Sequence, residues 1–228
     1  LGAGVVGSAT AYFLAQAGHN VALVEKATGP GSECSFANGG LLDASSITPW
    51  AGPSVPRMVW STLAQDHAPY KVRPNFDPYM WVWGLQFLKN CRAPNAKATT
   101  ESLRHLAGYS LEVLRDVSSN EGLHCERRSK GIIHLFRTEQ EFVKARKNLQ
   151  PTKTNSSIPI DIKDLIKLVP GLSGSKNAFA GGIHHQADET GDAHLFARGI
   201  AEAAQRCGAK MHFGEQAKHI LMDSGQVI

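Results

Sequence analysis

The sequence predicts an α/β protein in which a strand–helix–strand unit begins at the N-terminus, is interrupted by a mixed α+β insertion, and resumes near the C-terminal end. Two observations favour this fold class. The first 26 residues read as a glycine-rich turn, a helix and a short apolar strand. Residues 192–222 read again as a helix followed by strands, whereas the stretch between mixes long helical segments with separate strands.

The glycine-rich turn has the spacing G-x-G-x-x-G, formed by Gly2, Gly4 and Gly7. In a dinucleotide-binding unit the first glycine permits a tight turn, the second leaves room for the pyrophosphate, and the third lets helix and strand pack closely. The following helix would direct its free N–H groups at the phosphates. The alternative is a glycine-rich turn in an unrelated α/β protein, which the motif alone does not exclude.

The elements after this turn complete the pattern. Residues 8–17 have helical composition, and Gly18 stands where a helix C-terminal glycine is expected. Residues 21–24 form an apolar run typical of a buried parallel strand, which ends at Glu25, an acceptor for ribose hydroxyls. Only Leu1 precedes Gly2, so we expect the chain to begin inside its own first strand and to be a fragment.

Loops follow Glu25, before the insertion begins. Residues 27–32 form one, and the small residues of 33–42 would let the backbone lie against a flat ligand or form a plain surface loop. The helices expected next are at 57–65, 79–92, 100–119 and 138–149, and Thr138 and Glu141 form a capping box for the last of these. A further short helix is capped by Asp161 and ends at Pro170. Strands are expected at 131–137 and 178–185, and residues 156–160 form a linker or a short strand.

The interrupted unit resumes with a helix at 192–206, strands at 210–213 and 217–222, and a turn at 223–225. This order predicts a discontinuous Rossmann-like domain. Residues 1–45 form its first segment, residues 46–187 form the inserted substrate domain, and residues 188–228 form its second, incomplete segment.

Composition narrows the function. The net charge is only +4 and the basic residues form no stripe, so nucleic-acid binding is not expected. The four cysteines are far apart in the sequence and make no C-x-x-C motif, which is typical of reduced thiols in an intracellular protein. No run of residues is long and apolar enough to span a bilayer.

Three features have two interpretations each. His184, His185 and His194 suggest a metal site, but adjacent histidines on a strand point to opposite faces, so we expect no metal. The acidic tract 188–192 is either a carboxylate cluster or the cap of the following helix. The aromatic run 79–88 would suit a helix in a membrane interface, but its shortness favours an ordinary packed helix or part of a partner surface.

Four stretches together resemble the D-amino-acid dehydrogenase small-subunit family of the FAD-dependent D-amino-acid oxidase superfamily. They are residues 2–26, residues 34–42 with Pro49-Trp50, residues 80–91, and residues 122–141 with 181–196. The first is shared by many FAD and NAD proteins. The tract S-F-A-N with Pro49-Trp50, and D-E-T-G-D before Leu195, are more specific.

The resemblance implies that FAD binds at the N-terminal turn, that the loop after Cys34 lies near its pyrophosphate and flavin, and that a strand near Ala217 touches its adenine through the backbone. The expected FAD contacts are Leu1, Gly2, Ala3, Gly4, Val5, Val6, Gly7, Ser8, Tyr12, Glu25, Lys26, Ser35, Ala37, Asn38, Gly39 and Ala217. Members of the family are nearly twice as long, and the groups that clamp the substrate carboxylate belong to the other half, so no catalytic residue is named.

The implied reaction is oxidation of a D-amino acid to an imino acid, which hydrolyses to a 2-oxo acid and ammonia. The flavin takes a hydride from Cα and passes electrons to a quinone or another acceptor. Such an enzyme is cytoplasmic and lies peripherally on the inner face of a bacterial plasma membrane. The alternatives are a glycine or sarcosine oxidase of the same superfamily, a non-catalytic FAD-binding module, and an NAD-dependent dehydrogenase.

Overall fold

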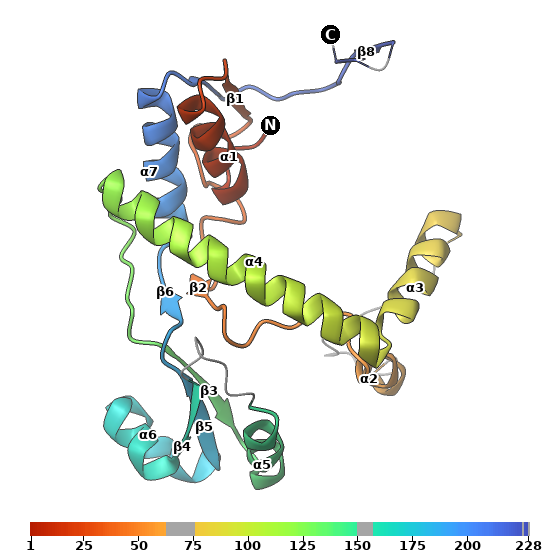
Figure 1. Ribbon diagram of the computed structural model, residues 1–228, viewed down its shortest axis with the longest axis vertical. Helices are drawn as coiled ribbons and strands as arrows, with labels where there is room; N and C mark the ends of the chain where they lie inside the picture. Colours follow the sequence, from red (N-terminus) through yellow and green to blue (C-terminus); the bar gives the residue numbers. More distant parts are fainter. Residues whose placement is uncertain (63–75, 150–156, 225, 228) are drawn as a thin grey trace. The chain divides into compact units, whose positions relative to one another are not determined.

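The computed structural model describes residues 1–62, 76–149, 157–224 and 226–227 (Figure 1). The chain divides into two compact units. The first unit comprises residues 1–42 and 112–228, and the second comprises residues 43–111. Helix α4 (Ala93–Asn120) contributes residues to both. The functional domain boundaries expected after residues 45 and 187 stay a prediction.

The interrupted strand–helix–strand unit is present in the first unit. Strand β1 (Ala22–Glu25) pairs in parallel with β7 (Lys210–Phe213), although about 180 residues separate them in the sequence. The Gly2 N–H donates to the Val24 carbonyl at 2.8 Å. The Val21 carbonyl accepts from the Lys210 N–H of β7, and carbonyls that are an odd number of residues apart along a strand face opposite edges. The Val24 carbonyl therefore faces away from β7, and the start of the chain lies beside the edge of β1 opposite β7.

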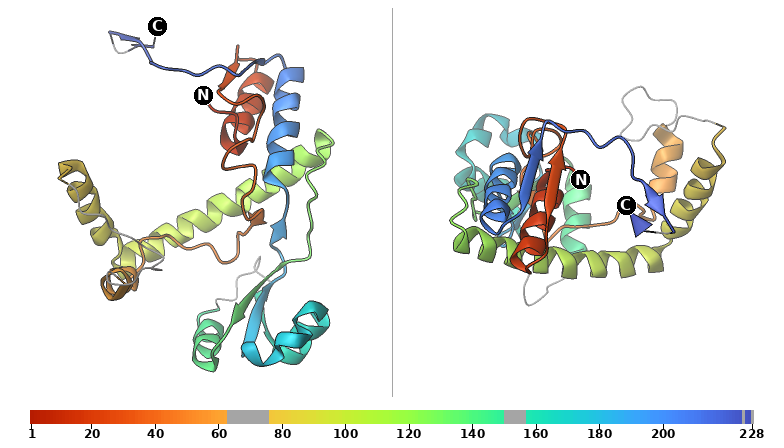
Figure 2. Two further views of the ribbon diagram at one scale, coloured as in Figure 1. Left: turned by 180° about the vertical axis from the view of Figure 1, so that it is seen from behind. Right: turned by 90° about the horizontal axis from the view of Figure 1, so that it is seen from above.

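Helices α1 (Val5–Gln16) and α7 (Ala193–Arg206) lie side by side (Figures 1 and 2). Buried alanines line their contact, and small side chains let two helix backbones approach closely. This core also takes in the C-terminal turns of α4 and the two strands. Its buried members are Ala3, Ala11, Tyr12, Ala15, Leu23, Val117, Ile200, Ala201, Ala203, Ala204 and Ala209.

A second sheet in the first unit is antiparallel, with β5 (Gly181–His185) between β3 (Ile132–Phe136) and β4 (Ser157–Asp161). Helix α5 (Glu139–Lys147), helix α6 (Ile162–Leu168) and the 3-10 segment η1 (Pro170–Ala178) accompany it. A Cβ added at Gly181 would lie 2.7 Å from the Phe142 ring, so glycine lets α5 pack onto this sheet.

A short antiparallel pair joins these parts of the first unit: β2 (Leu41–Leu42) and β6 (Glu189–Thr190). Neither strand was expected from the sequence. The second unit holds α2 (Val55–Thr62), α3 (Pro78–Asn90) and the N-terminal part of α4. The expected helix at 57–65 corresponds to α2, and its last three positions lie outside the described residues.

The local capping signals are confirmed. Thr138 and Glu141 form a capping box at α5. The Asp161 carboxylate accepts from the Asp164 N–H at 2.9 Å, and Asp192 accepts from the Leu195 N–H at 2.8 Å. The expected strand or linker near 157 is strand β4.

The strand expected at 217–222 is wrong. Residues 217–221 have no regular structure, and β8 (Met222–Asp223) forms a hairpin with β9 (Gln226–Val227). Ile220 and Leu221 are exposed, because no neighbouring strand of the described chain offers this segment a ladder. An apolar run alone therefore does not make a strand here.

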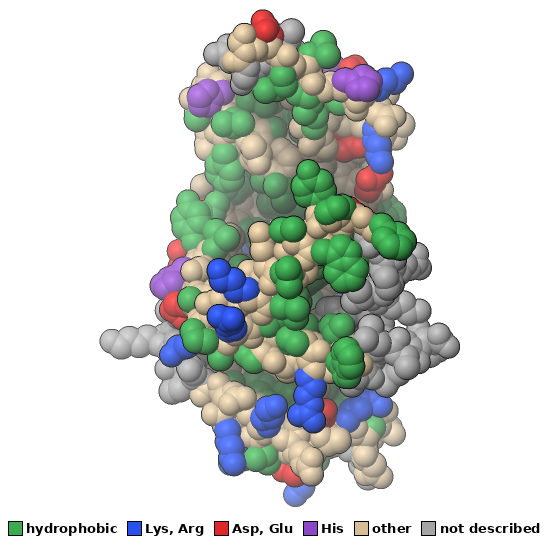
Figure 3. Space-filling model, turned by 90° about the vertical axis from the view of Figure 1, so that its right-hand side faces the viewer, with side chains coloured by type: hydrophobic (Ala, Val, Ile, Leu, Met, Phe, Trp, Pro, Cys, Tyr) green, Lys and Arg blue, Asp and Glu red, His purple; other side chains and the backbone are tan. Residues whose placement is uncertain are grey.

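Helix α3 has no buried residue, so the expectation of an ordinary packed helix is not met in the part of the chain described. Hydrophobic side chains gather on the face drawn in Figure 3, and those exposed on α3 are Tyr79, Trp81, Val82, Trp83, Leu85 and Leu88. Asp77 caps the helix by accepting from the Tyr79 N–H at 2.9 Å. None of the helices in the described ranges has the length and hydropathy needed to cross a bilayer.

A partly exposed polar link ties together the helix ends of the first unit. The Tyr12 hydroxyl donates to one Glu121 oxygen at 2.8 Å, and Arg206 donates to the other at 2.8 Å. Hydrogen bonds from Arg206 and Tyr12 hold the pKa of Glu121 below its ordinary value. Burial, followed by the contact with Glu121, raises the pKa of Tyr12 to about 12.

This link predicts a pH-dependent stability. Because the pKa of Glu121 is lower in the folded chain, its contribution is present above the unfolded glutamate pKa of about 4.3 and is lost as pH falls through the folded value. We expect Glu121→Gln to lower the free energy of unfolding at about pH 7 and to leave it unchanged at about pH 3. Urea unfolding at both pH values measures this. Glu112→Gln, at an exposed position of α4, is the control, and equal losses at both pH values would contradict the prediction.

Candidate functional site

The glycine turn has the geometry that close packing demands. Gly2 has φ +83°, in the left-handed region that favours glycine. A Cβ on Gly7 would lie 1.8 Å from the Gly2 carbonyl oxygen, so only glycine lets α1 begin against the turn. A Cβ on Gly4 would lie 3.3 Å from Ser35 Oγ, and this hydroxyl also accepts from the Val5 N–H at 3.2 Å. The turn is therefore in contact with the loop that follows β1.

The N-terminus of α1 offers positive charge and donors. Its N-cap, Gly4, has no side chain to accept from the helix N–H groups, Ser35 Oγ accepts only from that of Val5, and no acidic residue lies in the first turn. The first N–H groups of a helix have no intrahelical acceptor, and the helix dipole adds partial positive charge there. This arrangement suits an anion such as a pyrophosphate.

Glu25 connects the end of β1 to the turn. One carboxylate oxygen accepts from the Ala3 N–H at 2.6 Å and the other from the Ala27 N–H at 2.9 Å. These backbone donors, that of Ala27 first, lower the pKa of Glu25. Glu25 is thus an ionised acceptor, and each oxygen retains the capacity for a further hydrogen bond, as a ribose hydroxyl would require.

The small-residue loop meets the D-E-T-G-D tract. The Gly191 N–H donates to the Gly40 carbonyl at 2.8 Å, and a Cβ on Gly40, at φ +59°, would lie 2.2 Å from the Gly191 oxygen. On the other side of the tract, Arg128 and Thr190 exchange two backbone hydrogen bonds of 2.8 and 3.0 Å, and the Asp192 N–H donates to Cys125 at 2.8 Å. The tract is therefore held between residues 40–42 and 125–128.

Two cavities adjoin this junction. One of about 310 Å³ is mainly apolar and is lined in part by Val5, Leu41, Leu42, Leu114 and Phe196. The other, of about 260 Å³, is more polar and adds Phe36, Gly39, Glu126, Arg128 and Thr190. Both share Ser35, Asn38, Gly40, Gly191, Asp192 and Ala193. Val5 links the apolar cavity to the start of α1, so turn, loop and tract border one region.

A buried ion cluster lies behind the tract. The Glu189 side chain is only 4% exposed and forms ion pairs with Arg115 at 2.7 Å and Arg127 at 3.4 Å. Arg115 also donates to the Ala187 carbonyl at 3.3 Å. Because side chains alternate along a strand, Glu189 faces the arginines while Thr190 faces the polar cavity. The cluster fixes which face of β6 points at the cavity.

The structure brings together most of the expected FAD contacts: the turn from Gly2 to Gly7, Glu25, and Ser35, Asn38 and Gly39 of the loop. Leu1, Val6 and Ala37 are exposed near these segments. Ala217 is not in a strand, but Glu215, two residues earlier, donates its N–H to the Glu25 carbonyl at 3.1 Å.

Three expected contacts have other partners. Tyr12 is 2% exposed, and its hydroxyl is bonded to Glu121, so its side chain offers nothing to a pyrophosphate. Ser8 is buried and donates to the Ala3 carbonyl at 3.1 Å. Lys26 forms an exposed ion pair with Glu33 at 2.6 Å, which raises the pKa of Lys26. The Tyr12 ring is therefore part of the hydrophobic core between α1 and α7.

Sequence reasoning did not assign the residues that line the cavities from the far side: Leu41, Leu42, Leu114, Cys125, Glu126, Arg128, Thr190, Gly191, Asp192 and Phe196. The signal that pointed to them is the D-E-T-G-D tract. Of the two interpretations of that tract, the helix cap is confirmed, since Asp192 caps α7. Glu189 instead forms ion pairs with Arg115 and Arg127.

The three histidines considered as metal ligands, His184, His185 and His194, each contact a different group. His184 Nε2 is 3.1 Å from the Lys130 carbonyl, His185 Nδ1 is 2.7 Å from Ser157 Oγ, and His194 Nδ1 is 3.0 Å from the Gly31 carbonyl. In the ranges that the structure covers, no group of at least three His, Cys, Asp or Glu residues is placed to hold a metal ion.

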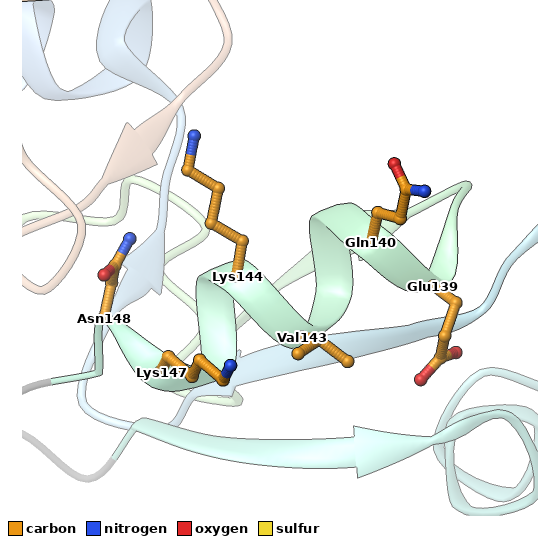
Figure 4. A pocket seen from close by; sticks show the side chains of 6 residues that line it. All are labelled: Glu139, Gln140, Val143, Lys144, Lys147 and Asn148. Carbon is orange, nitrogen blue, oxygen red and sulfur yellow. The ribbon is translucent and has the colours of Figure 1, made fainter.

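A hollow of about 480 Å³ on α5 is a separate feature (Figure 4). Its lining side chains all come from that helix and the residue after it: Glu139, Gln140, Val143, Lys144, Lys147 and Asn148. It contains none of the expected FAD contacts, so the candidate site is the region at the glycine turn.

Comparison with known proteins agrees with this geometry. The chain is 36% identical over 230 residues to a D-amino acid dehydrogenase of Bradyrhizobium diazoefficiens, covering 100% of this chain and 54% of the relative. It is 35% identical to a D-amino acid dehydrogenase of Rhodopseudomonas palustris, with the same coverage. The chain thus spans about half the length of these curated relatives.

Solved structures show the same fold at low identity. Glycine oxidase from Bacillus cereus superposes with a TM-score of 0.61 at 21% identity, covering 99% of this chain and 49% of that protein. L-proline dehydrogenase from P. horikoshii gives 0.62 at 16%, covering 99% and 46%. The family described as FAD dependent oxidoreductase matches residues 1–228. The chain therefore belongs to the FAD dependent oxidoreductase family, as its glycine turn and resemblance predicted.

Proposed function

We propose that the full-length protein oxidises D-amino acids to 2-oxo acids and ammonia, using FAD held by the region described above. The observation that carries the proposal is the continuity of that region. The N-terminus of α1, the ionised Glu25 and the cavities beside residues 35–42 all border it. The curated relatives named D-amino acid dehydrogenase support the choice of substrate.

The residues present fit FAD in three ways. The absence of a Cβ at Gly7 lets the free N–H groups of α1 start close to the turn, where they would hold the pyrophosphate. Glu25 would accept from ribose hydroxyls, since its charge is retained at neutral pH. The apolar cavity beside Leu41 and Phe196 would exclude water from a flat ring.

When bound, FAD supplies the hydride acceptor for oxidation of the substrate Cα–H bond. The role of this chain is to bind and orient that cofactor. The N-terminus of α1 and Glu25 would hold its pyrophosphate and ribose, and the junction between residues 40–42 and the D-E-T-G-D tract would hold its ring end. We propose no substrate-clamping residue in this chain. A glycine or sarcosine oxidase reaction is the second candidate, because the fold is shared with glycine oxidase.

The finer part of the proposal concerns the electron acceptor. We infer a quinone-type acceptor and a peripheral contact with the membrane that contains it. The exposed side chains of α3 support this contact, since Tyr79 is 84% and Trp83 is 63% exposed. Tyrosine and tryptophan favour the membrane interface, and Lys89 in the last turn of the helix would favour anionic lipid.

The glycine turn predicts a loss of cofactor binding. In Gly7→Ala the added methyl group would meet a backbone carbonyl, so α1 must shift away from the turn. We expect FAD affinity to fall by about tenfold or more, measured by titration of the apoprotein with FAD. Gly108→Ala, in an open position of α4, is the matched control and should bind FAD like the wild type. Equal affinity in both variants would contradict this role of Gly7.

The substrate assignment predicts a spectroscopic change. Purified full-length protein should carry flavin absorbance, which anaerobic D-alanine bleaches because the flavin is reduced. L-alanine should leave it unchanged. Bleaching by glycine or sarcosine but not by any D-amino acid would favour the oxidase alternative, and a bound flavin that no amine bleaches would indicate a non-catalytic module.

The membrane contact predicts binding to lipid. Full-length protein should sediment with vesicles of mixed zwitterionic and anionic lipid. Replacing Tyr79, Trp83 and Leu85 together by serine should reduce the bound fraction severalfold, because exposed apolar area is lost. Trp50→Ser removes an exposed tryptophan outside α3 and serves as the control. Unchanged sedimentation of the triple variant would refute a contact through α3.

A further inference from the structure

Asn38 and Gly39 form the one Asn-Gly pair in the sequence, and they lie in the loop that follows β1. The Asn38 side chain is exposed and borders both cavities beside the D-E-T-G-D tract. The backbone nitrogen after an asparagine can attack the side-chain amide, and glycine at that position leaves the approach free because it has no Cβ. The proposed function uses Asn38 only as a contact, so this chemistry is a separate property of the loop.

The side-chain carbonyl of Asn38 is activated by the backbone. The Gly40 N–H donates to Asn38 Oδ1 at 2.8 Å, which closes a turn between the side chain and the main chain two residues on. When a nucleophile attacks Cγ, negative charge develops on Oδ1, and a donor already directed at this oxygen stabilises that charge. The Gly40 carbonyl is in turn bonded to the Gly191 N–H, so the donor is held in place. The turn therefore favours attack at Cγ.

The backbone nitrogen of Gly39 is available as the nucleophile. Over the part of the chain that the structure describes, its N–H donates to no acceptor, and the same holds for the N–H groups of Ala37 and Asn38. No helix or strand includes these three residues, so ring closure would break no backbone ladder. A Cβ at Gly39 would have only Leu41 side-chain atoms as neighbours, at 3.6 and 3.8 Å. The nitrogen is therefore next to its target and its approach is unobstructed.

We propose that Asn38 is a site of spontaneous deamidation when no cofactor covers this loop. The Gly39 nitrogen loses its proton to solvent and bonds to Asn38 Cγ, the Cγ–Nδ2 bond breaks, and the amide nitrogen leaves as ammonia with a proton from water. The product is a five-membered succinimide. Water then opens either of its two ring C–N bonds and yields aspartate or isoaspartate at this position. The net reaction consumes one water, releases one ammonia, and oxidises or reduces nothing.

Deamidation changes the candidate site in two ways. Both products add a negative charge beside the cavities, and isoaspartate also lengthens the main chain by one carbon. Asn38 is among the expected FAD contacts and FAD carries an anionic pyrophosphate, so the added charge should weaken cofactor binding. Bound FAD should in turn cover the loop and slow the reaction. This protection rests on the proposed function, whereas the chemistry at Asn38 does not.

The test is the appearance of isoaspartate in full-length protein freed of FAD and incubated at mildly alkaline pH, located by peptide mapping with mass spectrometry. We expect Asn38 to react within about tenfold of its rate in a synthetic peptide of residues 33–42. Gly39→Ala, which fits the space beside Leu41, should slow the reaction about tenfold or more. Asn177, an exposed asparagine that precedes alanine, is the internal control and should stay intact.

Two further measurements test the effect on the cofactor. Saturating FAD should slow isoaspartate formation at Asn38 severalfold in the protein and leave the peptide unaffected. Asn38→Asp, which introduces the charge directly, should bind FAD about tenfold more weakly than the wild type. Asn177→Asp adds the same charge outside both cavities and should bind FAD like the wild type.

The outcomes separate this inference from the proposed function. If Asn38 stays intact in the FAD-free protein while the peptide converts, the folded loop blocks the attack and the inference is refuted. If Gly39→Ala reacts as fast as the wild type, the succinimide route is refuted. If FAD binds but does not protect Asn38, the cofactor's part in the inference fails while the proposed function stands. If no FAD binds and Asn38 still deamidates, the proposed function fails and the modification site stands.

Discussion

The contact between Gly7 and the Gly2 carbonyl is the constraint on which the candidate site depends. A side chain at Gly7 would push the first turn of α1 away from the glycine turn, because the obstacle is the Gly2 backbone and cannot rotate aside. The position of α1 then sets two further relations. Its start meets Ser35, and its buried face packs against the alanines of α7. A single missing methyl group thus allows both the anion-binding helix end and the core behind it.

The second half of the site depends on pairing between distant segments. The D-E-T-G-D tract uses its residues in alternation: Glu189 is neutralised by arginines behind it, Thr190 faces the cavity, and Asp192 caps α7. Burying a carboxylate is costly unless it is paired, so the tract has little freedom to slip by one residue. This alternation lets a short acidic sequence cap α7 with one carboxylate and pair another with arginines.

Features encoded within a few residues could be predicted from the sequence, and features that need a distant partner could not. The turn glycines and the caps at Thr138, Asp161 and Asp192 depend on neighbours along the chain, and the structure has them as expected. Strands β2 and β6 are each two residues long and depend on pairing with distant segments, so no periodicity marks them. Residues 217–221 have the composition of a strand but pair with no strand in the ranges that the structure describes. Tyr12 was expected to contact the cofactor, but its side chain is buried in the core, which depends on packing against distant segments.

The pairing of Gly40 with Gly191 has a consequence for how the protein reaches its folded form. The two residues are separated by about 150 positions, and closing such a loop costs conformational entropy before any contact repays it. The glycine turn and α1 depend on contacts within one short segment of the chain, but the junction must wait until residue 191 has been synthesised. We therefore expect the two halves of the candidate site to form at different stages of folding, the glycine turn before the junction of loop and tract.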